Sequence, residues 1–166
     1  MGEAVTSRDE VAGAVAFLLR STQHRPQTEA ELRAKLAGRD VPGDVAEAAM
    51  ARALEIGAVD DTAFARAWVE DRGHRRGFGA ARLREELRRR LLPEELIAQA
   101  LGVLDERDDL ATATELARRR FGQLPNALSP EAAARRLHAH LQRRGYPPDL
   151  ARRVATSVSG LDRQWD

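Results

Sequence analysis

The sequence of 166 residues contains no cysteine, only 4% aromatic residues and no long apolar run. The absence of cysteine excludes disulfides, thiolate metal sites and cysteine nucleophiles, and it fits the reducing cytoplasm. The longest apolar run, residues 11–19, is interrupted by Gly13 and is too short to span a bilayer. No basic N-terminal segment of the kind found in signal peptides precedes it. We therefore expect a cytoplasmic protein that does not bind membranes.

Hydrophobic residues make up 43% of the chain and charged residues 32%, with Ala, Leu, Arg and Glu prominent. These are good helix formers, so the composition predicts an all-α protein. The formal net charge is only +1, but the charges are unevenly distributed. Residues 1–61 are net acidic, whereas residues 62–104 and 105–166 are each net basic. The basic side chains therefore gather in the middle and the C-terminal third of the chain.

A pattern of two leucines and a proline recurs along the chain. The leucines are four residues apart and the proline follows six residues later, at Leu32, Leu36 and Pro42; Leu83, Leu87 and Pro93; Leu137, Leu141 and Pro147. The copies lie 51 and then 54 residues apart. Such recurrence is typical of repeat proteins, in which each unit leaves an apolar flank for its neighbour to cover. The spacing predicts three tandem three-helix repeats, at residues 8–57, 58–105 and 106–160.

Helix starts can be assigned within each repeat. Ser7 with Glu10, and Thr28 with Glu31, have the spacing of capping boxes. The first box predicts a helix that ends near residue 20. The remaining starts are marked by acidic residues, serine or proline, at Pro42, Asp60 or Asp61, Pro93, Asp108, Ser129 and Pro147.

The most specific stretch is residues 57–92, in the middle repeat. Asp60 and Asp61 precede a helix, and Leu83 and Leu87 form the inward stripe of the following one. Adjacent carboxylates attract cations, which makes a metal or acid–base pair the alternative to helix capping. Neighbouring side chains at a helix start diverge, so we favour capping.

Phe64 and Trp68 lie four residues apart and share one face of the first helix in this stretch. Aromatic side chains of this kind stack on bases in proteins that bind single strands. Because Ala65 and Val69 lie beside them, we expect Phe64 and Trp68 to pack in the core instead.

Taken in order, these residues resemble the RecX family, regulators of the bacterial recombinase RecA. The central signature comprises Gly57, Val59, Asp60, Asp61, Phe64, Ala65, Trp68, Arg72, Gly77, Gly79, Leu83, Glu86 and Leu87. Further matching positions lie near both ends of the chain, at Arg25, Thr28, Glu31, Leu32, Arg143, Arg144, Gly145 and Tyr146. The resemblance implies an elongated, curved array of three three-helix repeats. The chain departs from the family at Leu91 and Leu92, where the second repeat usually carries a glycine, so the form of that turn is open.

The resemblance also implies a function in homologous recombination, DNA repair and the SOS response. RecX proteins bind along the groove of the RecA filament on single-stranded DNA and mostly inhibit the ATPase, strand-exchange and co-protease activities of RecA. We accordingly expect the RecA filament as partner, contact with single-stranded DNA either directly or through the filament, and a monomer. The alternative is a free-standing DNA-binding protein, since three-helix units also resemble helix-turn-helix domains.

No constellation of residues points to catalysis. The four histidines, at positions 24, 74, 138 and 140, lack the spacing of a metal site. No serine, lysine or histidine set has nucleophile spacing, and no Gly-rich phosphate loop is present. We therefore expect neither a cofactor nor a metal, and no enzymatic activity.

Arginines are the candidate binding residues. On one helix Arg82, Glu85, Glu86 and Arg89 share a face. Glu85 can pair there with Arg89 and Glu86 with Arg82, which would make an ordinary solvated surface. Arg75 and Arg76 have no nearby acidic partner beyond Asp71, and Arg88 and Arg90 flank the leucine stripe. These four arginines are the ones we favour for contact with DNA phosphates or with an acidic protein surface. The sequence leaves binding surface and solvated face open. The candidates for contact with RecA or DNA are Arg72, Arg75, Arg76, Arg82, Arg88, Arg89, Arg90, Arg119, Arg120, Arg143 and Arg144.

Overall fold

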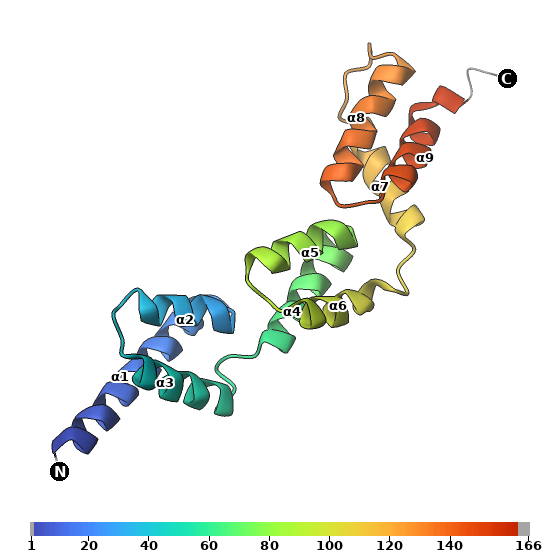
Figure 1. Ribbon diagram of the computed structural model, residues 1–166. Helices are drawn as coiled ribbons and strands as arrows, with labels where there is room; N and C mark the ends of the chain where they lie inside the picture. Colours follow the sequence, from blue (N-terminus) through green and yellow to red (C-terminus); the bar gives the residue numbers. More distant parts are fainter. Residues whose placement is uncertain (1, 163–166) are drawn as a thin grey trace. The chain divides into compact units, whose positions relative to one another are not determined.

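The computed structural model describes residues 2–162, with side chains from residue 8 onward, and this part of the chain is all-α without a strand (Figure 1). Three consecutive sets of three helices follow one another, as the recurring Leu–Leu–Pro pattern predicts. The helices are α1 (Gly2–His24), α2 (Glu29–Ala37), α3 (Gly43–Glu55), α4 (Asp61–Val69), α5 (Ala80–Arg89), α6 (Glu94–Leu101), α7 (Asp109–Phe121), α8 (Pro130–Arg143) and α9 (Pro148–Ser159). A π-helical turn, Glu70–Arg75, continues α4, and a 3₁₀ turn, Gly102–Leu104, continues α6.

The helices form two compact units, residues 1–67 with 87–97 and residues 68–86 with 98–166. In the first unit, α3 packs against both α1 and α2, around a core that includes Leu18, Leu32, Leu36, Val45 and Met50. In the second unit, α7, α8 and α9 pack against one another around Ala113, Ala117, Leu137, Leu141, Tyr146 and Val154. Both cores are built from the apolar stripes of amphipathic helices.

The second leucine of each repeated pattern ends its helix in the same way. The carbonyl oxygens of Leu36, Leu87 and Leu141 each accept a hydrogen bond from the N–H five residues later, at 3.2, 3.3 and 3.2 Å. The residue directly before each N–H donor, which lies two positions before the proline, adopts a positive φ: Asp40 at 55°, Leu91 at 60° and Gly145 at 90°. This is the left-handed helix end that glycine favours. Leu91 therefore adopts the turn that a glycine would make, although a leucine is strained there.

Most predicted helix starts are confirmed, with one exception. Thr28 and Glu31 form a complete capping box, and the side chains of Asp108 and Ser129 accept from the N–H groups three residues on. The predicted cap at Ser7 is wrong, since α1 already begins at Gly2 and ends four residues later than expected, at His24.

The two aspartates at the start of α4 have different roles. Asp60 caps its own helix, because its Oδ1 accepts from the N–H of Ala63 at 2.8 Å. Asp61 instead accepts from the N–H of Glu29, the first residue of α2, at 2.8 Å. The expectation that both aspartates cap α4 is therefore correct for Asp60 and wrong for Asp61, which satisfies a free N–H group at the start of another helix.

Phe64 and Trp68 are only half-buried, whereas Leu83 and Leu87 are fully buried. The expected core packing of the two aromatic residues is thus partly wrong. The guanidinium of Arg72 lies over the Trp68 ring at 4.1 Å from its centroid, and that of Arg90 lies 5.5 Å from the Phe64 centroid. Such cation–π contacts stabilise an aromatic ring that the core does not enclose.

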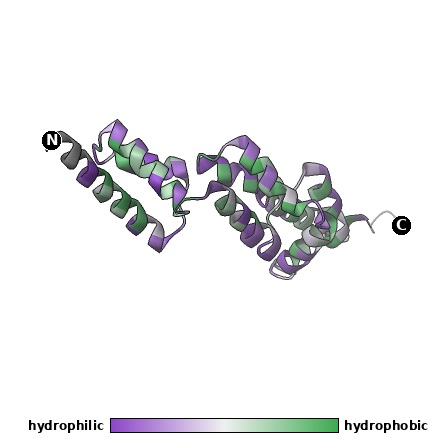
Figure 2. Cartoon of the chain, turned by 90° about the horizontal axis from the view of Figure 1, so that it is seen from below, coloured by the Kyte–Doolittle hydropathy of each residue, from purple (hydrophilic) through white to green (hydrophobic). Residues whose placement is uncertain are grey.

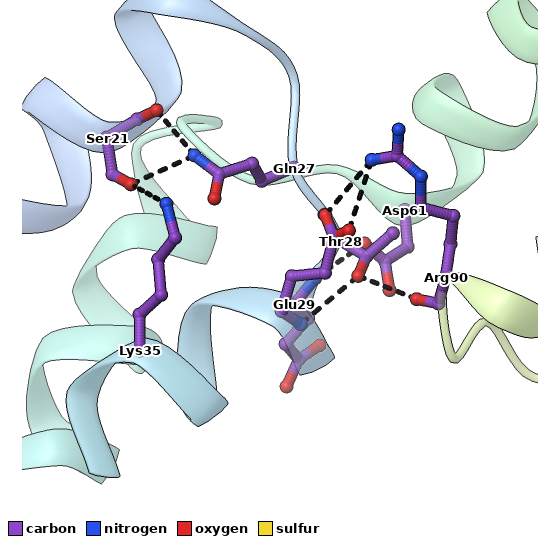
Figure 3. A network of polar contacts seen from close by, with 8 residues as sticks. Ser21, Gln27, Thr28, Glu29, Lys35, Asp61 and Arg90 are labelled. Carbon is purple, nitrogen blue, oxygen red and sulfur yellow. Dashed lines mark hydrogen bonds and ion pairs between the residues drawn. The ribbon is translucent and has the colours of Figure 1, made fainter. Parts of the chain in front are cut away.

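A polar network in the first unit joins the start of α2 to the end of α5 (Figure 3). Thr28, fully buried, donates its hydroxyl hydrogen to the carbonyl of Arg90 at 2.9 Å. The Arg90 guanidinium in turn donates to both carboxylate oxygens of Glu31, at 3.1 and 3.3 Å. Because this ion pair is shielded, with each side chain 22% exposed, it fixes the two segments together. These contacts give Thr28 and Glu31, two of the family-like positions, a structural role.

Hydrophilic and hydrophobic residues are mixed along every helix drawn in colour (Figure 2). None of the helices the structure describes combines the length and the apolar character needed to cross a membrane. Each one instead has a mixed surface, as expected for helices packed in small cores.

Candidate functional site

Five of the predicted arginines come together in one groove of the second unit, which we call the basic groove. It has a volume of about 420 Å³ and lies where the segment after α4 meets α7 and α8. Its lining residues are Arg75, Arg76, Phe78, Leu116, Arg119, Arg120, Gln123, His140 and Arg144. None of them is acidic, so the groove has the charge of an anion-binding surface.

The backbone on one side of the groove is held by the close approach of two glycines. The N–H of Gly79 donates to the carbonyl of Arg144 at 2.8 Å. A Cβ on Gly79 would lie 2.4 Å from the Gly145 carbonyl oxygen, and one on Gly145 would lie 2.5 Å from the Arg82 nitrogen. Only glycine permits so close an approach in both segments of the backbone. The end of α8 is thereby fixed against the segment that carries Arg75 and Arg76.

Two buried side chains hold the same segment from beneath. Tyr146 donates its hydroxyl hydrogen to the carbonyl of Gly77 at 2.9 Å, and burial raises the pKa of this phenol to about 12. The guanidinium of Arg107, only 7% exposed, donates to the carbonyls of Gly73 and Phe78 at 2.7 and 2.9 Å. The segment from residue 73 to residue 79 therefore has little freedom, and the groove is preformed.

Arg144 both lines the basic groove and makes contacts that hold the fold. Its guanidinium donates to the carbonyl of Arg76 at 2.7 Å and lies 5.0 Å from the Phe78 centroid, while Arg82 lies 3.9 Å from the same centroid. Burial lowers the pKa of Arg144, and the nearby charge of Arg82 lowers it further. The aromatic ring thus keeps two cations close together at the edge of the groove.

His140 lies among these arginines. Burial lowers its pKa, and the positive charges of Arg144, Arg120 and Arg143 lower it further. Burial is the larger cause of the lowered pKa, and the positive potential of the arginines adds to it. An anion bound in the groove would offset the contribution of the arginines.

The remaining groove arginines extend toward solvent. The side chains of Arg75 and Arg76 are 75% and 55% exposed, and both reach Asp71, at 3.8 and 3.0 Å. Arg119 pairs with Glu115 at 2.7 Å, and Arg120 donates to the Gln123 amide oxygen at 3.2 Å. Exposed pairs of this kind contribute little to stability, so these arginines remain able to exchange a carboxylate for another anion.

The other predicted arginines lie outside the groove. Arg72 and Arg82 both reach the half-buried carboxylate of Glu86, which also accepts from the indole of Trp68 at 3.1 Å. Arg88 pairs with Glu94, and Arg90 with Glu31. Arg89 and Arg143 are exposed, at the ends of α5 and α8. The expected pairing of Glu86 with Arg82 is confirmed, and Arg72, Arg82, Arg88 and Arg90 take part in ion pairs within the protein.

Several groove residues were not predicted from the sequence. Phe78, Leu116, Gln123 and His140 line the groove, and Arg107 supports it, but none belongs to a recognisable short motif. Tyr146 was noted only as a family-like position. Within residues 2–162, no group of three or more histidine or acidic side chains has an arrangement that holds a metal ion.

Three family models match successive parts of this chain. They are the RecX first, second and third three-helix domains, over residues 19–52, 60–101 and 106–155. The protein named Regulatory protein RecX of Thermobifida fusca is 38% identical over 153 residues, which cover 92% of this chain and 82% of that protein. The protein of the same name in Streptomyces coelicolor is 37% identical over 147 residues, 89% of this chain and 78% of that protein.

Two solved structures share the fold. One, a crystal structure of regulatory protein RecX, superposes with a TM-score of 0.72 at 22% identity, over 89% of this chain and 72% of that chain. The other, RecX from Lactobacillus salivarius, has a TM-score of 0.75 at 14% identity, over 91% and 97%. The three-helix organisation is therefore retained at low sequence identity.

Proposed function

Since the chain belongs to the RecX family of regulatory proteins, we propose that it binds the RecA filament on single-stranded DNA and lowers the ATPase, strand-exchange and co-protease activities of RecA. It acts as a monomer in the cytoplasm, without a catalytic step of its own. The basic groove is the observation that carries this proposal, because a preformed anion-binding surface suits the phosphates of filament DNA or an acidic surface of RecA.

The charges in the groove support contact with an anion. Five arginines line it, and within the part of the chain that the structure describes their carboxylate partners are Asp71 and Glu115. The three ion pairs that these two carboxylates form lie at the protein surface, so a phosphate can replace the carboxylates at little cost in stability. Arginine presents a planar fork of N–H donors, which matches phosphate and carboxylate oxygens equally well.

Candidate arginines outside the groove differ in their availability. Arg143, at the end of α8, is exposed and extends the proposed binding surface of the second unit, whereas Arg89 is exposed in the first unit. Arg72, Arg82 and Arg90 serve mainly to hold the fold, because their partners Glu86 and Glu31 are only 16% and 22% exposed. Arg88 is intermediate, in an exposed pair with Glu94.

Co-sedimentation with preformed RecA filaments tests the proposal. Filaments assembled on single-stranded DNA with a slowly hydrolysed ATP analogue should carry the protein into the pellet, and free single-stranded DNA at equal concentration should retain less of it. If the protein stays in the supernatant at every filament concentration, it does not bind RecA filaments.

The second candidate, a free-standing DNA-binding protein, is supported by the same basic groove and by the three-helix organisation. It requires salt-dependent binding to bare duplex DNA with a preference for particular sequences. It also requires that RecA activity be unaffected. A gel-shift series with several duplexes, performed beside the filament experiment, separates the two functions.

A further inference from the structure

A second groove is lined by both apolar and basic side chains. It runs between α7 and α9 in the second unit, has a volume of about 520 Å³, and we call it the α7–α9 groove. Its lining residues are Leu110, Thr114, Arg118, Phe121, Arg153, Val154, Ser157 and Val158. The proposed function makes no use of this groove.

The apolar part of the α7–α9 groove is unusually open. Leu110 and Phe121 are 43% and 42% exposed, although α7 buries Ala113 and Ala117 on its other side. Leu110, Thr114, Arg118 and Phe121 follow one another at helical spacing along α7, so they form a single stripe. This stripe is roughly 16 Å long, the length of three helical turns. Large apolar side chains that are exposed along a groove, as Leu110 and Phe121 are at the two ends of this stripe, are a feature of interaction surfaces.

The two arginines in this groove differ from their sequence neighbours. Arg119 pairs with Glu115 and Arg152 pairs with Asp149, each at 2.7 Å. Arg118 and Arg153, which face the groove, have no carboxylate partner within residues 2–162. No acidic residue lines the groove. Arg118 and Arg153 thus leave two positive charges beside the exposed Leu110 and Phe121.

We infer that the α7–α9 groove binds a short acidic segment of another protein, with large apolar side chains against Leu110 and Phe121 and carboxylates on Arg118 and Arg153. Apolar side chains of a partner would cover the exposed Leu110 and Phe121, and its carboxylates would pair with the arginines. One segment that carries both kinds of side chain is therefore complementary to the groove. Nucleic acid fits less well, since Leu110, Val154 and Val158 are aliphatic and Phe121 is the single aromatic ring among the lining residues on which a base could stack. The inference does not depend on RecA or on DNA binding.

A labelled model peptide tests this inference by fluorescence anisotropy. The probe is an amphipathic peptide of about fourteen residues, long enough to cover the stripe, with leucine and phenylalanine on one face and glutamate beside them. The full-length protein should bind it, and a peptide with lysine in place of glutamate, or with serine in place of the apolar residues, should bind at least about tenfold more weakly.

Variants assign the contact to the groove. Arg118→Gln with Arg153→Gln should weaken binding roughly tenfold, and Phe121→Ser should weaken it similarly, without a change in the circular dichroism spectrum. The matched control, Arg136→Gln with Arg152→Gln, also removes two exposed charges and should bind like the parent. Equal binding by parent and groove variants would overturn the inference.

Three other results would overturn it as well. One is the absence of binding up to about 1 mM peptide, which is the weak limit of specific recognition. Another is displacement of bound peptide by a short single-stranded oligonucleotide, which would assign the groove to nucleic acid. The third is concentration-dependent self-association that Phe121→Ser abolishes, which would assign the groove to a second copy of the chain.

Discussion

Gly79 and Gly145 are packed backbone to backbone, so closely that a Cβ on Gly79 would lie 2.4 Å from the Gly145 carbonyl oxygen. This contact joins the loop before α5 to the turn after α8, two segments 66 residues apart in the sequence. It also sets the position of the arginines on both sides of the basic groove. The two glycines therefore support the proposed binding surface without contacting the partner.

Gly79→Ala should lower the stability of the second unit by about 3 kcal/mol or more, because the obstructing atoms are backbone and cannot move aside. Urea denaturation followed by circular dichroism measures the change. Gly43→Ala is the matched control: a Cβ there meets nothing within 4 Å, so this variant should be as stable as the parent or slightly more so. A Gly79→Ala protein with an unchanged midpoint would contradict the described contact.

Leu91→Gly should stabilise the protein by about 0.5–1 kcal/mol. The leucine has a φ of 60° and a side chain that is 63% exposed, so glycine relieves backbone strain while little apolar contact is lost. The control is Leu92→Gly, which removes a buried side chain and should destabilise. Thermal melting of both variants measures the change in stability, and a lower melting temperature for Leu91→Gly would show that the Leu91 side chain contributes to stability.

Asp61 gives the stability a pH dependence of known sign. Burial raises the pKa of its carboxyl, and Glu29, Asp60 and Glu31 raise it further, against the hydrogen bond from the Glu29 N–H, which lowers it. Over the interval from the ordinary carboxyl pKa up to the raised one, the folded state binds more protons than the unfolded state. Stability from this group therefore falls as pH rises through that interval.

Asp61→Asn keeps an oxygen that accepts from the Glu29 N–H but has no charge, so it should be more stable than the parent at pH 7 and indistinguishable from it in acid. Asp61→Ala leaves that N–H without its partner and should cost about 1 kcal/mol. Urea midpoints measured across pH test both expectations. Equal stability of parent and Asp61→Asn at every pH would refute the assigned cause.

His140 should report binding in the basic groove. Its pKa is lowered in the free protein by burial and then by Arg144, Arg120 and Arg143. A bound phosphate favours the protonated imidazole, so binding takes up a proton and affinity should rise as pH falls toward the histidine range. NMR titration of the His140 ring with and without a single-stranded oligonucleotide measures the shift. A pKa that does not rise would place the anion elsewhere.

The groove also sets the expected salt dependence. If the five groove arginines each contact one phosphate, the slope of log affinity against log salt should be roughly −3.5 on single strands. Replacing Arg75 and Arg76 by glutamate should make the slope shallower. A slope near zero would mean that phosphates are not the contacted groups.

Local signals in the sequence predicted the helices well. The Leu–Leu–Pro pattern marks fully buried leucines and a shared helix end, and Thr28, Asp108 and Ser129 cap helices as their spacing predicts. Both depend on residues within one helix and the turn that follows or precedes it, which is why the sequence alone suffices. The division into repeats at residues 8–57, 58–105 and 106–160 stays a prediction.

Long-range contacts were not predictable in the same way. Arg90 meets Glu31 across 59 residues, and Asp61 meets the backbone of Glu29 across 32. An isolated sequence does not reveal which carboxylate an arginine reaches, so structural and binding arginines were predicted as one set. The groove itself depends on the Gly79–Gly145 contact, which no short motif encodes.

RecA-catalysed ATP hydrolysis on single-stranded DNA tests the central claim most directly. The parent protein should reduce the steady-state rate in a concentration-dependent manner, and Arg75→Glu with Arg76→Glu should reduce it far less, with an unchanged melting temperature. The matched control, Arg135→Glu with Arg136→Glu on the exposed face of α8, should inhibit like the parent. A hydrolysis rate that is the same with and without the parent protein would contradict the account.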